Sequence, residues 1–220
     1  MSSLIKNVGT IGGLTLVSRL FGFARDMLLS RILGAGGVAD AWQLAFQLPN
    51  IFRRLFAEGA FSAAFVPLFN RRMTKEGDVS EAREFTDAVL AVLIPILIIF
   101  SALMMIAMPW IMGFFANDAL KADKPTFDLA IWMAWIAFPY LAFMSIATLF
   151  AAILNSLSRF AAAAAAPILL NICLVGALLL GMITGDGSDA ARANTGFYLA
   201  TSVSISGVLQ LVWLYVWVRK

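Results

Sequence analysis

Four long stretches without a charged residue restrict this chain to a fold that crosses a lipid bilayer. They are residues 88–117, 129–158, 160–185 and 193–218. Each is longer than the roughly 20 apolar residues that a helix needs to span the hydrocarbon core. Of all residues, 61% are hydrophobic and 13% are charged, whereas soluble domains carry about 25% charged residues. We therefore predict an all-α integral membrane protein.

Charged residues interrupt the first 70 residues, although the rest of this region is apolar. We predict two further spans here, so that the chain forms a bundle of six transmembrane helices. The arginine-rich start offers neither a short apolar core nor a small-residue cleavage site, so we expect no signal peptide to be removed. The six predicted spans are about 8–33, 39–70, 88–116, 129–155, 160–184 and 194–218.

The distribution of Lys and Arg predicts which side of the membrane the termini occupy. Six spans place both termini on one side, and cytoplasmic loops carry the excess of positive charge. With both termini in the cytoplasm, eight of these residues lie inside and three outside, namely Lys6, Arg71, Arg72, Lys75, Arg83, Arg159, Arg219 and Lys220 against Lys121, Lys124 and Arg192. We therefore predict cytoplasmic termini. No basic stripe falls in a soluble region, so we expect no nucleic acid as a partner.

The residue types that most metal and redox sites require are scarce. His is absent, and the single cysteine, Cys173, lies inside an apolar span. A disulfide, a haem site and a Cys/His zinc site are therefore excluded within one chain, and we expect no metal or cofactor. The sequence also contains no nucleophile–base pair and no phosphate loop of the GxxxxGK type. An enzyme is the least expected class.

Four arginines at the predicted membrane depth are the main candidates for a functional site, and they are Arg19, Arg25, Arg53 and Arg54. An arginine at a lipid-exposed helix centre costs at least about 2.5–3.5 kcal/mol, so these side chains must face a cavity or a partner. Asp26, Asp40 and Glu58 lie in the same region. One interpretation is a set of internal ion pairs that only holds helices together. The other is an anion site, because a guanidinium binds two phosphate oxygens and keeps its charge.

Helical spacing separates the arginines in the second predicted span. Arg54 and Glu58 stand one turn apart on one face, which predicts an i,i+4 ion pair. Arg53 points away from Arg54 and has no acidic residue one turn from it in either direction. We therefore expect Arg53 to contact a ligand and Arg54 to be structural.

In the first span, Ser18, Gly22 and Arg25 share one stripe of the predicted helix. Arg19 and Asp26 are seven residues apart on a neighbouring stripe, where an intrahelical pair would stretch over two turns. We expect Arg25 to be freer than Arg19.

A broken helix is expected beside these arginines. Pro49 removes a helical hydrogen bond, so we predict an irregular backbone at 48–50, which survives in a membrane only where protein or water satisfies it. The candidate hinges are Gly22, Pro49, Asn50 and Gly59. We predict a cavity between the first two spans that receives an anionic, phosphorylated substrate. The residues alone leave open a nucleotide carrier, a lipid-phosphate transporter and an anion channel.

Several motifs resemble those of the MurJ/MviN family, and they occur in the family's order and spacing. They are SRLFGFARD at 18–26, GAG at 34–36, ADA at 39–41, LPNIFRRLFAEGAFS at 48–62, FVP at 65–67, LNS at 154–156 and PILLN at 167–171. Together they cover most of the chain. The resemblance implies the multidrug/oligosaccharidyl-lipid/polysaccharide exporter superfamily, in which two six-helix lobes surround a central cavity and work by alternating access.

The resemblance also implies a cargo and roles for individual residues. The cargo is lipid II, the undecaprenyl-diphosphate-linked peptidoglycan precursor, moved between the leaflets of the bacterial inner membrane. The substrate-binding positions match Arg19, Arg25 and Arg53, with Ser18 on the Arg25 stripe, and the gating and coupling positions match Asp26, Asp40 and Glu58, with Arg54 as the partner of Glu58. The expected partners are lipid II, membrane lipids and a carboxy-terminal lobe.

Two departures from the family pattern bear on function. Family members are about twice as long, so the second lobe is missing from these 220 residues, and we do not expect the chain to transport alone. Ala163 stands where relatives commonly place a proline. The alternatives to a transporter lobe are a membrane scaffold, in which the arginines form structural ion pairs, and a drug/cation antiporter lobe, in which an unpaired acid would dominate the cavity.

Overall fold

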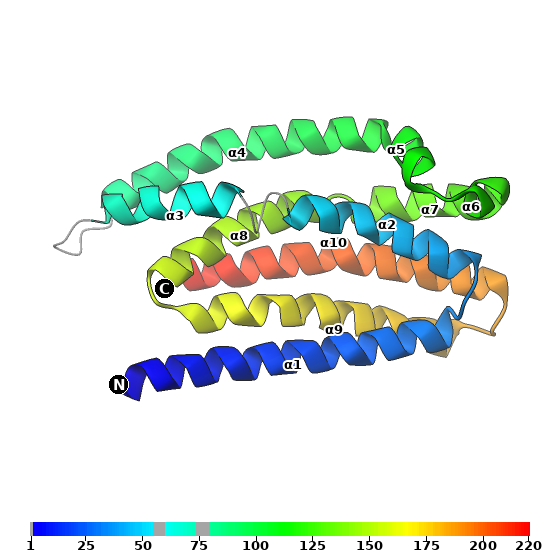
Figure 1. Ribbon diagram of the computed structural model, residues 1–220, viewed down its shortest axis with the longest axis horizontal. Helices are drawn as coiled ribbons and strands as arrows, with labels where there is room; N and C mark the ends of the chain where they lie inside the picture. Colours follow the sequence, from blue (N-terminus) through cyan, green and yellow to red (C-terminus); the bar gives the residue numbers. More distant parts are fainter. Residues whose placement is uncertain (1, 55–59, 74–79) are drawn as a thin grey trace.

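The computed structural model describes residues 2–54, 60–73 and 80–220, without the side chains of residues 2–8 and 60–62. The described residues form ten helices that run mostly along the long axis of the molecule (Figure 1). Their bounds are α1 Ser2–Ile32, α2 Gly37–Arg53, α3 Ala60–Arg72, α4 Ser80–Ile106, α5 Met108–Phe115, α6 Asp118–Ala122, α7 Lys124–Ala137, α8 Tyr140–Ser156, α9 Phe160–Thr184 and α10 Asp189–Arg219.

Four helical segments are long and apolar enough to cross a membrane. They are Ser80–Ile106, Lys124–Ser156, Phe160–Thr184 and Asp189–Arg219, and they contain most of the four uncharged stretches of the sequence. The first begins eight residues before the predicted span at 88, because the charged residues that precede it continue the helix. Glu81 lies in its first turn, where a carboxylate interacts favourably with the helix dipole.

Two spans predicted as single helices are divided, and both divisions lie at a proline. α4 ends at Ile106 and α5 begins with Pro109 in its first turn. α7 gives way to α8 at Pro139. Carbonyls beside the divisions are satisfied from other helices, since Trp135 Nε1 donates to Met105 O at 2.7 Å and Ser204 Oγ donates to Ile136 O at 2.6 Å. A membrane protein tolerates such breaks where neighbouring groups satisfy the carbonyls.

Pro49 does not break the helix that contains it, so the predicted irregular backbone at 48–50 is wrong. α2 continues through Pro49 to Arg53, and Pro49 is buried. In apolar surroundings the helix keeps the remaining backbone groups hydrogen-bonded, so the loss of one bond costs less than ending the helix. The Arg54 amide still bonds to Asn50 O and Ile51 O.

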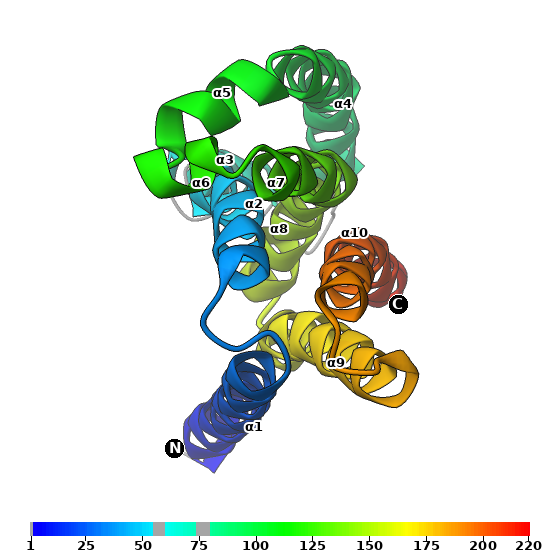
Figure 2. The same ribbon diagram turned by 90° about the vertical axis from the view of Figure 1, so that its right-hand side faces the viewer.

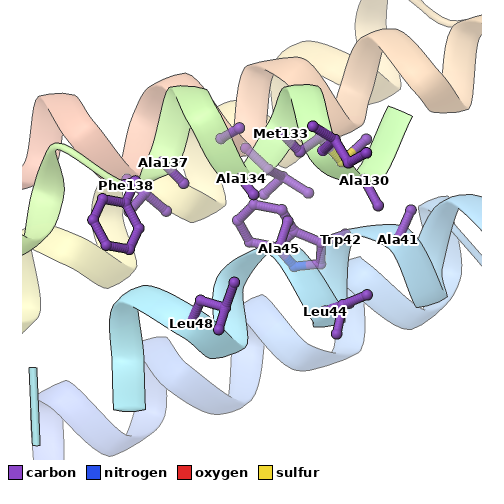
Figure 3. Close-up of a cluster of buried hydrophobic side chains, with 14 of the residues drawn as sticks. Ala41, Trp42, Leu44, Ala45, Leu48, Ala130, Met133, Ala134, Ala137 and Phe138 are labelled. Atoms are coloured by element: carbon purple, nitrogen blue, oxygen red, sulfur yellow. The ribbon is translucent and has the colours of Figure 1, made fainter. Parts of the chain in front are cut away.

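Helices α8 and α10 lie at the centre of the molecule, and each of them contacts several other helices. Figure 2 shows α2, α7 and α8 side by side, with α4 to α6 on one side and α9, α10 and α1 on the other. One core cluster joins α2, α7 and α10, where Trp42, Ala45 and Leu48 face Ala134 and Phe138 (Figure 3). A second cluster lies among α3, α4, α8, α9 and α10.

Helix α1 lies at the edge of the molecule and packs chiefly against α9 (Figures 1 and 2). Its other face is apolar and open, because Leu16, Leu20, Phe23 and Met27 are each about 60% exposed or more. Both termini lie at the same end of the molecule (Figure 1). Of the charged side chains that the structure describes on α1, those of Arg19, Asp26 and Arg31 are exposed and that of Arg25 is partly buried.

Candidate functional site

The stripe of α1 that faces α9 carries Ser18, Gly22 and Arg25, as the helical spacing predicts. Arg25 donates from Nε and Nη2 to Asp26 Oδ1, at 2.9 and 2.8 Å. Its Nη1 donates to Oδ1 of Asn171 on α9, at 3.1 Å. The Arg25 side chain is 24% exposed and that of Asp26 is 65% exposed. Arg25 is therefore held by one charged and one neutral acceptor.

This geometry contradicts the expectation that Arg25 is the freer arginine. Helical spacing predicts contacts between residues one or two turns apart, because adjacent residues on a helix do not point the same way. The long Arg25 side chain nevertheless reaches the carboxylate of the next residue and an amide 146 positions away in the sequence. Arg25 is thus engaged on two sides.

Arg19 is exposed, and in the described part of the chain no hydrogen bond or ion pair engages its side chain. It lines a cavity of about 510 Å³ between α1, α8 and α9. The other lining residues are mostly small or apolar, with Thr15, Ser18 and Asn155 as the polar ones, and they are completed by Ile11, Ala151, Phe160, Ala163, Ala164 and Pro167. The cavity therefore presents one guanidinium in an otherwise uncharged lining.

This cavity is not the predicted one between the first two spans, which stays a prediction. No described residue of α2 lines it, and its second wall comes from α8 and α9. Ala163 and Ala164 have no side-chain atoms beyond Cβ, so they do not fill the cavity. The alanine run therefore helps to shape it. The tertiary contacts of α1 with α9, which lie far apart in sequence, decide the position.

Arg53 has a polar partner on its own helix. Its Nε donates at 3.3 Å to Oδ1 of Asn50, which lies one turn earlier on α2. A search for acidic residues at helical spacing could not reveal this neutral partner.

The remaining predicted residues lie on α1 and α2 or outside the described residues. Arg54 is exposed at the end of α2, and Asp40 is exposed in its first turn. Glu58 and Gly59 lie outside the described residues, so the Arg54–Glu58 ion pair stays a prediction. Gly22 lies within the continuous α1, opposite the Asn171 amide.

Asn171 was not predicted as a site residue. Asn171 is 8% exposed, and its Nδ2 donates to Ser18 O at 3.1 Å. It is the one amide side chain in the uncharged stretch 160–185, and a polar residue at membrane depth is itself a signal of function. That signal could have found it.

The fold and site define a class: a multi-pass helical membrane protein with one arginine lining a cavity between its helices and a second arginine bonded to a buried amide of another helix. The family within that class follows from comparison with known proteins. A family model described as "Lipid II flippase MurJ" matches residues 29–220. The chain belongs to this family, and the family predicted from the sequence motifs is confirmed.

Relatives and a solved structure show how much of a family member this chain represents. A probable lipid II flippase MurJ of Rhizobium tropici is 43% identical over 99% of this chain and 40% of its own length. The lipid II flippase MurJ of Burkholderia cenocepacia is 36% identical over 96% of this chain and 39% of its own length. A structure of "Lipid II flippase MurJ, inward closed conformation" is 25% identical with a TM-score of 0.69, covering 92% of this chain and 40% of that one. The chain thus spans about 40% of the length of these proteins.

Proposed function

We propose that this chain is one lobe of a lipid II flippase, which moves the undecaprenyl-diphosphate-linked precursor across the bacterial inner membrane. The observation that carries the proposal is the exposed Arg19 in a cavity of about 510 Å³ whose lining is otherwise uncharged. A guanidinium in such surroundings suits a diphosphate, because it holds phosphate oxygens in pairs and keeps its charge. Membership of the MurJ family supports the same cargo.

The lobe has six spans in this proposal: α1, α2 with α3, α4 with α5, α7 with α8, α9, and α10. Both termini face the cytoplasm, which is consistent with their position at one end of the molecule. A second lobe then completes the transporter, because alternating access requires two units that rock about a shared site. The apolar open face of α1 is available to such a unit.

Within this lobe we assign roles as follows. Arg19, with Ser18 beside it, forms the first contact with the diphosphate, and Arg25 and Arg53 are further anion-binding groups. The gating and coupling residues are Asp26, Asp40, Arg54 and Glu58, and the hinges are Gly22, Pro49, Asn50 and Gly59. Membrane lipids and lipid II are the partners, and the protein acts as a transporter without an enzymatic step.

The alternatives make different demands on the site. A drug/cation antiporter lobe needs an unpaired acidic residue in the cavity, whereas the lining residues contain one charged side chain, which is an arginine. A scaffold needs each arginine to be paired, and Arg19 has no ion-pair partner among the described residues. Both observations favour a site for an anion.

The test is a chimera in which this chain replaces the matching 40% of the Rhizobium tropici relative. We expect the chimera to expose lipid II on the outer leaflet of cells depleted of their own flippase, and the 220-residue chain alone to fail. Arg19→Gln should reduce transport at least about tenfold with unchanged folded yield, because a charge-assisted contact with the diphosphate is lost.

The matched control is Arg192→Gln, which removes a charge from an exposed pair with Asp189 at the start of α10. This variant should transport normally. Full transport by Arg19→Gln, or transport by the isolated chain, would contradict the proposal.

A further inference from the structure

Asn171 connects the backbone and a charged side chain of α1 from the neighbouring helix. Its Oδ1 accepts from Arg25 Nη1, and its Nδ2 donates to Ser18 O, both at 3.1 Å. A guanidinium only donates and a carbonyl only accepts, so this orientation of the amide satisfies both partners and the reversed one satisfies neither. Gly22 lies opposite the amide, where a Cβ would be in ordinary van der Waals contact with Nδ2, at 3.8 Å.

The neutral character of the amide matters for what Arg25 can bind. Asn171 fixes Nη1 without cancelling the charge of the guanidinium, which a carboxylate in its place would do. Nε and Nη2 form the opposite, bidentate edge, and both donate to a single oxygen, Asp26 Oδ1. This edge is the one that usually holds a carboxylate or phosphate.

The two acceptors of Arg25 differ in how firmly they are held. Asn171 is 8% exposed and packed between α1 and α9, whereas the Asp26 side chain is 65% exposed. An exposed carboxylate exchanges its partner at a lower cost than a buried amide, because water can solvate it after it leaves. Asp26 is therefore the acceptor that an incoming anion can replace.

We propose that Asn171 is a positioning residue that holds Arg25 so that its Nε–Nη2 edge, occupied by Asp26 in this structure, faces a phosphate oxygen of the cargo. The inference rests on the proposed function and adds a residue to it. Asn171 acts through Arg25 and does not itself contact the cargo. Its effect on lipid II binding must therefore disappear when Arg25 is absent.

A double-mutant cycle in the chimera tests this requirement, with lipid II as the probe. We expect Asn171→Leu to weaken lipid II binding at least about tenfold, because a hydrogen bond to a charged group is lost. Arg25→Met should weaken it at least as much, and the double variant should bind no worse than Arg25→Met alone. Asn171→Ser, which is small and polar, is carried through the same cycle so that the result does not depend on the folding of the leucine variant.

The control is Thr184→Val, which removes a side-chain bond to Leu180 O on the same helix, away from Arg25. It should leave binding unchanged. Additive losses in the double variant, or undiminished binding by both Asn171 variants, would overturn the inference while the role of Arg25 stands. Undiminished binding by Arg25→Met would overturn the inference and the proposed role of Arg25 together.

Discussion

A guanidinium inside a membrane protein must have its charge stabilised, and Arg19 and Arg25 meet this requirement differently. Arg25 is stabilised by a carboxylate and an amide within 3.1 Å. Arg19 is exposed in an open cavity, where water or a ligand can satisfy it. Asp26 makes Arg25 part of an ion pair, whereas Arg19 is the one charged residue that lines the cavity.

At two glycines, we expect an added methyl group to change the stability of the fold in opposite directions. A Cβ at Gly207 would lie 2.9 Å from the Tyr140 ring and 3.2 Å from Phe143 Cβ, whereas one at Gly176 would meet nothing within 4 Å among the described residues. Gly207→Ala should lower the free energy of unfolding by about 1–3 kcal/mol, because a rigid ring must move. Gly176→Ala should leave it unchanged or raise it. Unfolding in detergent measures both, and equal stability of the two variants would contradict this packing.

At the scale of the elements, two spans are divided: α4 with α5, and α7 with α8. Near each division, a backbone carbonyl accepts a hydrogen bond from a side chain of another helix. The divisions at Pro109 and Pro139 lie close to bonds donated by Trp135 and Ser204. Pro49 causes no such division in α2. Pro95 in α4 and Pro167 in α9 also lie within continuous helices, so a proline does not by itself divide a membrane helix.

The Trp135 bond allows a direct test at the scale of an element. Trp135→Phe keeps most of the ring but removes the donor to Met105 O, so it should lower the free energy of unfolding by about 1 kcal/mol. Trp110→Phe is the matched control, because Trp110 lies on α5 and is 73% exposed. Thermal stability in detergent compares them. An equal effect of the two changes would show that the bond does not stabilise the division.

At the scale of the whole molecule, the chain termini and the inter-helix turns lie at the two opposite ends of the helices. The termini lie at one end, and α6 and the turn between α9 and α10 lie at the other (Figure 1). In that turn, hydrogen bonds from Ser188 hold the pKa of Asp186 below its usual value. Residues 182–190, which contain the turn, are exposed.

The orientation of the molecule can be tested with two single cysteines in a Cys173→Ala background. Lys121→Cys on α6 should react with an impermeant maleimide in intact spheroplasts, because the positive-inside rule places α6 outside. Lys220→Cys, at the end of α10, should react only after the membrane is permeabilised. Labelling of both cysteines from the same side would contradict the proposed topology.

Long uncharged stretches suffice to predict a helical, membrane-spanning chain, because they have no other stable form in lipid. The motifs identified the family, and helical periodicity placed Ser18, Gly22 and Arg25 on one face. Which arginine is bonded within the protein and which lines a cavity depends on the packing of separate helices. Asn171 reaches Arg25 from 146 positions away, and the cavity at Arg19 forms where α8 and α9 meet α1. Spacing along one helix carries no information on such contacts, because they depend on how separate helices pack.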